Sequence, residues 1–217
     1  MKLESDGILI ALRPLGERDS VARIFTRDHG VLCGMMRGAA VARHNRPLVG
    51  QYGAAAWNAR LDSQLGAFHW EATRNLAAPL MAGAGRLAAM NAAFALIATL
   101  LPERERFETL FDDTCALLAT LTDAADVAAP YLAWEIELLR ELGYALDTTH
   151  CASCGRRDHL NYLSPRTGRA VCDACAAPYI GRLYTLPLTL DVTGRFLSAA
   201  CDQMGAAMPP ARQMLQI

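Results

Sequence analysis

The sequence has only one lysine, few aromatic residues and no apolar run long enough to cross a membrane. Its longest apolar run, residues 87–101, is interrupted by Asn91 and Thr99, and it falls short of the roughly 20 residues that a spanning helix needs. The N-terminus meets Glu4 and Asp6 before any apolar stretch, so no secretory signal is expected. These absences predict a soluble, cytoplasmic protein without a membrane partner.

The composition favours closely packed helices over a large β-sandwich. The chain has 217 residues, of which 53% are hydrophobic and 7% aromatic, and alanine supplies much of the hydrophobic fraction. This length is enough for one or two domains. An odd number of cysteines, seven, without a secretory signal argues against a disulfide framework.

Acidic residues are missing between Asp28 and Asp62, where four arginines lie. The overall net charge is −1, but its distribution is uneven. Residues 1–74 carry +3, residues 75–150 carry −7 and residues 151–217 carry +3. The two ends are therefore mildly basic, and the acidic middle is not expected to contact DNA.

The first 75 residues or so alternate between short apolar runs and turns, a pattern typical of β-structure. A turn ending in glycine, Asp28–Gly30, splits two of the runs and predicts a hairpin. Five short strands in this length suggest a small closed barrel, and the OB-fold is a barrel of this size. The predicted strands cover Gly7–Leu12, Val21–Thr26, Val31–Arg37, Leu48–Leu61 and Leu65–Thr73, the last two joined by Asp62–Gln64.

After Pro79 the apolar pattern changes to a helical period. Helices are expected over residues 80–101, over residues 103–121, from a cap at Asp126 to about Leu142, and over residues 187–204. The fold class expected is α+β, with an OB-fold domain at residues 1–78 and a helical domain at residues 79–217. A loop-rich element of the second domain, about residues 147–181, contains two CxxC pairs.

The two CxxC pairs predict a zinc site. Cys151 and Cys154 are followed, after seventeen residues, by Cys172 and Cys175, a spacing inside the range of known zinc-binding pairs. Two tight turns can each place two thiolates on one ion and so complete a tetrahedron. The alternative is a pair of buried or redox-active CxxC motifs, but no βαβ pattern of the thioredoxin type accompanies them.

Ligation by four cysteines favours a structural ion over a catalytic one. A catalytic zinc usually keeps an open position and three protein ligands. His150 and His159 are surplus to the four thiolates, and the single HxE sequence, His69–Glu71, is far along the chain. The other three cysteines, Cys33, Cys115 and Cys201, lie singly in apolar surroundings and are expected to be small buried residues.

The segment 37–46 joins two predicted strands and is the candidate DNA-binding loop. Arginine suits phosphate because its planar fork donates two hydrogen bonds, and OB-folds grip nucleic acid between loops. An ordinary solvated loop remains the competing interpretation. Tyr52, Trp57, Phe68 and Trp70 are expected in the core rather than stacked on bases. The candidate DNA-binding residues are Arg13, Arg18, Arg37, Arg43, Arg46 and Arg60, and Arg23 is expected to extend their surface.

Several segments resemble, in order along nearly the whole chain, the RecO family of bacterial DNA repair and recombination mediator proteins. No single segment is decisive, but the ordered set is specific. The segments are Gly7–Leu9 with Arg13–Asp19, Phe25-Thr26 with Gly30, Met36–Ala39, Glu137-Leu138 with Leu142–Tyr144 leading into Cys151–Gly155, and Leu163–Pro165 with Gly168.

The resemblance implies an N-terminal OB-fold and a helical domain with a four-cysteine zinc element. It also implies binding of single- and double-stranded DNA, annealing of complementary strands, and action with RecR to load RecA on DNA coated by single-strand-binding protein (SSB). The acidic C-terminal tail of SSB is the further implied partner, and the location implied is the bacterial nucleoid. Because the middle of the chain is acidic, that tail is expected to use Arg86, Arg140 or the basic C-terminal part.

Two other classes of function stay open at this stage. The first is a zinc-stapled scaffold that binds only proteins and no DNA. The second is a zinc enzyme, which the four-thiolate ligation disfavours, as does the lack of a P-loop, a Ser/His/Asp set or a paired-carboxylate arrangement. The sequence therefore predicts a protein that is not an enzyme.

Overall fold

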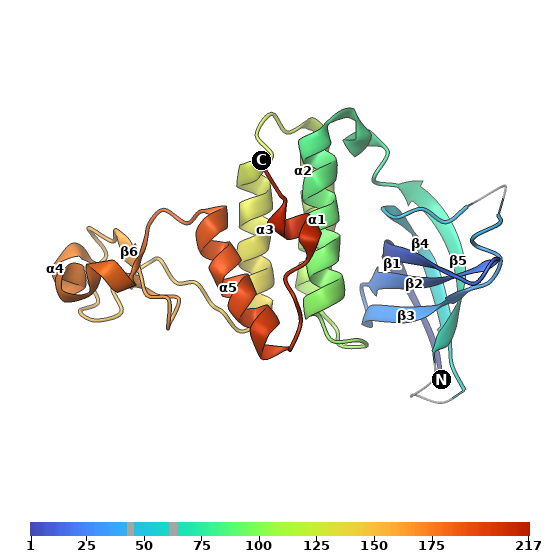
Figure 1. The fold of residues 1–217 in the computed structure, drawn as a ribbon, viewed down its shortest axis with the longest axis horizontal. Helices are drawn as coiled ribbons and strands as arrows, with labels where there is room; N and C mark the ends of the chain where they lie inside the picture. Colours follow the sequence, from blue (N-terminus) through green and yellow to red (C-terminus); the bar gives the residue numbers. More distant parts are fainter. Residues whose placement is uncertain (43–45, 61–64) are drawn as a thin grey trace. The chain divides into compact units, whose positions relative to one another are not determined.

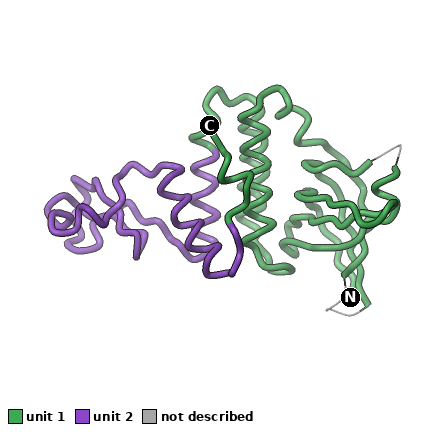
Figure 2. Tube along the Cα trace, viewed as in Figure 1, with its two compact units in different colours: residues 1–130, 208–217 green, residues 131–207 purple. Residues whose placement is uncertain are grey.

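The computed structural model describes residues 1–42, 46–60 and 65–217 of the chain. They form two compact units (Figure 2): residues 1–130 together with 208–217, and residues 131–207. The N-terminal strands close into a five-stranded barrel and helices follow (Figure 1). The predicted α+β class with an N-terminal OB-like barrel is thereby confirmed.

The barrel has the strand order β1-β2-β3-β5-β4, and β4 pairs with β1 to close it. Every pairing is antiparallel except that of β3 with β5, which is parallel at Gly34 and Gly66. A short parallel pairing of this kind lets β5 complete the ring beside β3. The strands are β1 (Lys2–Leu15), β2 (Asp19–Thr26), β3 (Gly30–Met36), β4 (Gln51–Asn58) and β5 (Gly66–Asn75).

β1 is longer than the predicted strand because it pairs with two other strands, each along a different part of its length. Its first half pairs with β4 from Lys2 to Ile8, and its second half pairs with β2 from Gly7 to Leu15. Alternate side chains fill the interior, as the two-residue period of a strand requires. The buried core of the barrel includes Leu9, Ala22, Ile24, Met36 and Ala55.

The helices of the first unit are α1 (Ala84–Leu100) and α2 (Glu108–Asp123), which lie side by side (Figure 1). A short 3-10 turn, η1 (Pro79–Ala82), leads into α1, and the final helix, α6 (Pro210–Gln213), contacts α1. The run that forms α1 is buried over much of its surface, which explains its apolar composition. Among the described residues, no helix is long and apolar enough to cross a membrane.

The predicted start of the second helix at Glu103 is wrong, because α2 begins at Glu108. Glu103 instead forms a β-bridge with Val31, and the backbone N–H of Arg104 donates to the Val31 carbonyl at 3.0 Å. Arg104 also has a φ of 65°, which no right-handed helix accepts. Tertiary pairing with the barrel thus outweighs local helix propensity over residues 103–107.

The second unit contains most of α3 (Ala128–Glu141), all of α5 (Leu190–Gln203) and the cysteine-bearing element between them. The predicted cap of α3 is confirmed, since Asp126 Oδ1 accepts a hydrogen bond of 2.9 Å from the Ala128 N–H. The intervening elements are β6 (Tyr162–Leu163), β7 (Ala170–Val171), α4 (Asp173–Ala176), η2 (Ala177–Arg182) and β8 (Tyr184–Thr185).

A polar contact inside the second unit joins α3 to α5. Glu135 is fully buried, and its carboxylate accepts hydrogen bonds from the hydroxyls of Thr193 and Tyr131. Aromatic contacts add to this core, with Phe196 of α5 meeting Tyr144 and Tyr184 edge-on. A buried carboxylate requires such partners, because burial without them is costly.

Candidate metal centre and nucleic-acid interface

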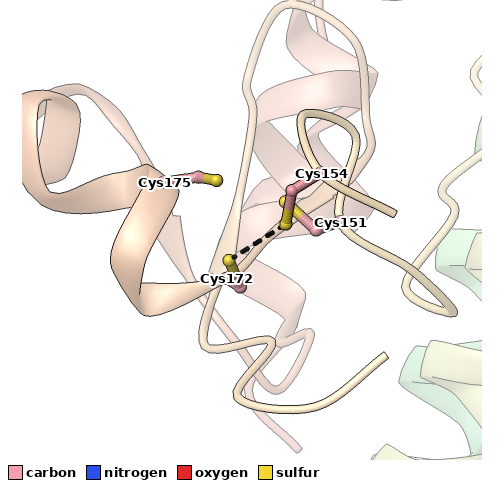
Figure 3. Close-up of side chains that lie close together, drawn as sticks. All are labelled: Cys151, Cys154, Cys172 and Cys175. Carbon is pink, nitrogen blue, oxygen red and sulfur yellow. Dashed lines mark hydrogen bonds between the residues drawn. The ribbon is translucent and has the colours of Figure 1, made fainter. Parts of the chain in front are cut away.

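The four predicted ligands come together in one cluster. The sulfur atoms of Cys151, Cys154, Cys172 and Cys175 all lie within 4.8 Å of one another. Figure 3 shows the four side chains converging from two separate chain segments, with Cys154 Sγ and Cys172 Sγ 3.7 Å apart. A zinc ion with four bonds of about 2.3 Å in a tetrahedron separates its sulfurs by about 3.8 Å. The arrangement therefore fits a tetrahedral metal ion.

Two tight turns carry the cysteine pairs. The first closes with a hydrogen bond of 2.9 Å from the Gly155 N–H to the Cys151 carbonyl, and Gly155 has a φ of 74°. Glycine adopts this left-handed conformation without steric cost. The second pair begins at the start of α4, where the Ala176 N–H donates to the Cys172 carbonyl at 2.9 Å. Both CxxC turns thus direct their thiols into the same space.

The surroundings of Cys151 favour a thiolate. Burial alone would raise the pKa of this thiol, but hydrogen bonds from the backbone N–H groups of Cys172, Cys154 and Ser153 outweigh it and lower the pKa to about 6. Such N–H donors stabilise the charged form, which is the form that binds metal. The cluster is also part of a small core that includes Val171 and Ala176.

The nearby histidine has other partners. His150 Nδ1 lies 3.4 Å from an Asp147 carboxylate oxygen, and its Nε2 lies 2.8 Å from an Arg169 guanidinium nitrogen. The three remaining cysteines are outside the cluster. One of them, Cys115, is half-buried on α2, and burial raises the pKa of its thiol to about 11. Within the described residues, only the four cysteines are close enough together to hold an ion.

The predicted DNA-binding arginines for which the structure gives a position are all exposed. Among the described residues, none of them has an acidic side chain within ion-pair distance. They are Arg13, Arg18, Arg37, Arg46 and Arg60. Arg43 lies outside the described residues, as do Leu61 and the predicted turn Asp62–Gln64. Unpaired, exposed guanidinium groups are available to phosphate oxygens.

Backbone contacts bring Arg18 and Arg37 to the same end of the barrel. The Arg18 carbonyl accepts a hydrogen bond of 3.0 Å from the Ala40 N–H. Asp19 Oδ1 accepts another, at 2.8 Å, from the Gly38 N–H. The turn after β3 is therefore tied to the turn between β1 and β2. We call this end of the barrel, residues 13–18 and 37–40, the arginine tip.

The other predicted arginines lie around the arginine tip and on a second loop. Arg13 is on β1, paired with Val21 of β2. Arg46 directly precedes Pro47, and Pro47 and Arg37 line the same cavity. Arg60 follows β4 on the connection to β5, near the N-terminus, where the Ala59 N–H donates to the Met1 carbonyl at 3.1 Å. The β1–β2 and β4–β5 connections are the two loops that OB-folds use to hold oligonucleotides.

Part of the usual binding face of an OB-fold, the outer surface of β2 and β3, is covered by the α1–α2 linker. Besides the pairing of Val31 with Glu103, Gly30 packs so closely that an added Cβ would lie 1.7 Å from the Glu105 carbonyl oxygen. Arg23 donates to the Ala98 carbonyl and lies 3.9 Å from Glu103. The expectation that Arg23 extends the basic surface is therefore wrong, because its guanidinium is used to hold α1 on the barrel.

A different face of the barrel is acidic. Glu4 and Asp6 of β1 lie across Ala56 and Ala54 of β4, with Glu71 on the far side on β5. These residues line a shallow hollow of about 430 Å³ whose floor is made of alanines. Phosphate is repelled by such a surface, so charge divides the barrel into a basic end and an acidic side.

The two arginines considered for an acidic peptide already have partners. Arg86 on α1 donates to the carbonyls of Thr122 and Ala124 at the C-terminal end of α2. Arg140 forms an ion pair with Glu137 on the next turn of α3. Of the alternatives named from the sequence, the basic C-terminal part remains, and Arg157, Arg166 and Arg182 are exposed there.

Sequence reasoning missed Asp19. Its carboxylate orders the arginine tip by accepting a hydrogen bond from the Gly38 N–H. In the sequence, Asp19 is only one of three consecutive charged residues, and nothing marks it as different from the others. It also missed the position of Trp70, which is half-buried at the rim of a cavity rather than enclosed in the core. Trp57 is buried as expected, and its indole N–H donates to the Cys33 carbonyl at 2.9 Å.

Comparison with known proteins matches both parts of the chain. Residues 1–74 match the family described as recombination protein O, N terminal, and residues 84–216 match recombination protein O, C terminal. A protein of Cereibacter sphaeroides (strain KD131) named DNA repair protein RecO is 38% identical, over 99% of this chain and 97% of its own length. Proteins of the same name from Ruegeria sp. (strain TM1040) and Rhodospirillum centenum are 40% and 43% identical, each over 86% of this chain and 78% and 76% of their own lengths.

Proposed function

The chain belongs to the RecO family of DNA repair proteins, and we propose that it is a non-enzymatic mediator of DNA repair and homologous recombination. In this proposal it binds single- and double-stranded DNA and anneals complementary strands. With RecR, it helps to load RecA on DNA coated by SSB.

The arginine tip is the observation that carries this proposal. Arg18 and Arg37 are exposed without acidic partners among the described residues, and two hydrogen bonds hold the loops that present them. Because part of the β2–β3 face is covered and another side of the barrel is acidic, the arginine tip and Arg60, which follows β4, are the proposed DNA contacts. Nucleic acid is therefore expected to run from the arginine tip towards Arg60.

Annealing follows from charge neutralisation. Two DNA strands repel one another through their phosphates, and arginines that contact both strands lower that repulsion. Such contacts release counterions, so binding weakens steeply as salt is raised. The arginines contact phosphate rather than base edges, so this part of the binding is indifferent to sequence.

The cysteine cluster has a structural role in the proposal. Four thiolates leave no open position for substrate, so the ion that fits is a structural zinc, one per chain. Its contribution is to fold the element at residues 147–181, whose small core includes three of the ligands, Cys151, Cys172 and Cys175. Zinc binding of this kind supplies about 10–16 kcal/mol of apparent free energy in small peptides, ample for an element of this size.

The acidic tail of SSB is proposed to meet the basic C-terminal part of the chain. Arg157, Arg166 and Arg182 are exposed there, and no acidic side chain of the described residues pairs with them. Arg86 and Arg140 are less suitable because each is bound within its own unit. Action on chromosomal DNA corresponds to a cytoplasmic, nucleoid-associated location.

The direct test is annealing of complementary oligonucleotides, bare and SSB-coated, at two salt concentrations. The proposal expects the protein to accelerate annealing at low salt, with the acceleration and the DNA affinity both falling as salt rises. No acceleration and no salt-dependent DNA binding would reject it.

A protein-only scaffold is the second candidate, and one observation favours it. The short turn η2 leaves all six of its residues exposed, including Tyr179 at 55% and Ile180 at 51%, and exposed apolar side chains of this kind often mark protein interfaces. Reversing Arg37, Arg43 and Arg46 to glutamate separates the two functions. If repair and complex formation survive while DNA binding is lost, the scaffold is the better account.

A further inference from the structure

A cavity of about 210 Å³ opens beside the arginine tip. Its wall includes Arg37, which carries a guanidinium, and the two aromatic residues Phe68 and Trp70. Met36 supplies an apolar surface next to them. His69 lies between the two aromatic residues on β5, but its imidazole is paired with Glu71 at 3.0 Å. Cationic and aromatic groups in one small cavity match a ligand that has both a negative charge and a flat, polarisable ring.

The register of the barrel explains why the rings are there. On β5, Phe68 and Trp70 alternate with exposed residues and pack partly against the core. Phe68 pairs with Trp57 of β4, whereas Trp70 pairs with the small Ala55. Phe68 and Trp70, two residues apart on β5, therefore point to the same face of the strand, and both line the cavity.

The indole N–H of Trp70 is a buried donor without an acceptor among the described residues. The other tryptophan of the barrel, Trp57, donates to the Cys33 carbonyl. Leaving a buried donor unsatisfied is unfavourable, and the difference between the two rings points to an acceptor supplied from outside the chain at Trp70.

We infer that this cavity binds one unpaired nucleobase of a single DNA strand. An aromatic ring contacts the base, a base carbonyl oxygen accepts from the Trp70 indole, and Arg37 contacts the adjoining phosphate. Bases in a duplex are stacked and paired, so only an unpaired base presents its face and its carbonyl together. The inference rests on the proposed DNA binding and deepens it, since it gives the barrel a preference for single strands.

The test compares three probes of equal length at one salt concentration: an oligothymidine, the same strand with abasic sites at all internal positions, and a duplex. The abasic strand keeps the phosphates and removes the bases. Stacking of one base typically changes affinity by about tenfold. The wild-type protein is therefore expected to bind oligothymidine roughly tenfold more tightly than the abasic strand.

Two variants assign that preference to the cavity. Trp70→Leu removes the ring and is expected to abolish the preference while binding of the abasic strand and duplex is kept. Trp70→Phe keeps a ring but removes the N–H, and it is expected to show an intermediate preference. Trp134→Phe, a change of a tryptophan in the other unit, serves as the control and should keep the full preference.

The outcomes separate this inference from the proposed function. Equal binding of oligothymidine and abasic strand by the wild-type protein would overturn the base-binding cavity while leaving electrostatic DNA binding intact. A folded Trp70→Leu variant that keeps the preference would overturn it as well. Failure of the wild-type protein to bind any of the three probes would reject the proposed function, and the cavity with it.

Discussion

The carbonyl oxygen of Arg18 accepts a hydrogen bond of 3.0 Å from the backbone N–H of Ala40. This contact joins the β1–β2 turn to the chain that leaves β3, and the Asp19–Gly38 hydrogen bond reinforces it at 2.8 Å. The pairing of Ser20 with Met36 already brings the segments of Arg18 and Arg37 together, and these contacts fix the turns that carry the two arginines. With these contacts, the arginines form one surface whose order has been established before DNA arrives, which reduces the entropy lost on binding.

Two substitutions at Asp19 separate its charge from its hydrogen bond. Asp19→Asn removes a negative charge beside the DNA surface but keeps an acceptor for the Gly38 N–H, so DNA affinity should rise, by about twofold to threefold. Asp19→Ala removes both, and the loss of the acceptor should cost about 1 kcal/mol of folding free energy. Fluorescence anisotropy with a single-stranded oligonucleotide should then show weaker binding by the alanine variant than by the asparagine variant. Equal affinity of the two variants would mean that the hydrogen bond does not order the tip.

A pair of glycine substitutions tests whether the α1–α2 linker packs against the outer face of β2 and β3. Gly16 and Gly30 both have φ near +65°, but only Gly30 faces a close neighbour, the Glu105 carbonyl. Gly16→Ala should cost about 1–2 kcal/mol from backbone strain alone. Gly30→Ala should cost about 1–3 kcal/mol more because the methyl group displaces the linker.

Urea unfolding of the two glycine variants measures this difference. If they are equally destabilised, the α1–α2 linker does not press on the β2–β3 turn, and the outer face of these strands becomes available for DNA. The argument that assigns DNA to the arginine tip would then lose one of its supports.

Removal of the metal should unfold one element and spare the rest. Wild-type protein and the Cys201→Ala control are expected to contain one zinc per chain, whereas Cys154→Ser should lose it. Limited proteolysis should then cut within residues 147–181 of Cys154→Ser, while the barrel stays resistant. A metal-binding dye measures the zinc released from each variant. The spectrum of the cobalt-substituted wild-type protein reports the number of thiolate ligands, and fewer than four would contradict the assigned ligand set.

The buried Glu135 makes the core of the second unit sensitive to Thr193. Thr193→Val keeps the shape of the side chain but removes the hydroxyl that donates to the carboxylate. Loss of a hydrogen bond to a charged group costs about 1.5–3 kcal/mol, whereas Thr193→Ser keeps the donor and should cost less. Thermal unfolding of the two variants checks the order, and a valine variant as stable as the serine variant would contradict it.

Much of this architecture is encoded locally and could be predicted. Alternating apolar residues and the turn at Gly30 indicated the strands, and the spacing of Cys151 to Cys175 indicated the cluster, because CxxC geometry depends on a few adjacent residues. The cap at Asp126 was likewise readable, since its acceptor lies within two residues of the N–H it binds.

The features that escaped prediction depend on contacts between distant residues. Helical propensity over residues 103–107 gave no sign that Glu103 would pair with Val31. Arg23 was expected on the DNA-binding surface, because nothing in the sequence indicated that its guanidinium donates to the Ala98 carbonyl of α1. In the same way, the cavity beside Trp70 brings together residues of β3, β5 and the chain around Pro47, which are far apart in the sequence. These contacts depend on how segments distant in the sequence pack against one another, which local sequence patterns do not specify.

The salt dependence of DNA binding tests the central claim most directly. The affinity for a single-stranded oligonucleotide should be measured over a range of salt concentrations for the wild-type protein, for Arg18→Gln/Arg37→Gln, and for the control Arg106→Gln, whose arginine pairs with Glu108. Each phosphate contact that is lost reduces the slope of log affinity against log salt by about 0.7. The account predicts a slope shallower by about 1.4 for the double variant and an unchanged slope for the control. A double variant with the wild-type slope and affinity would contradict the assignment of DNA binding to the arginine tip.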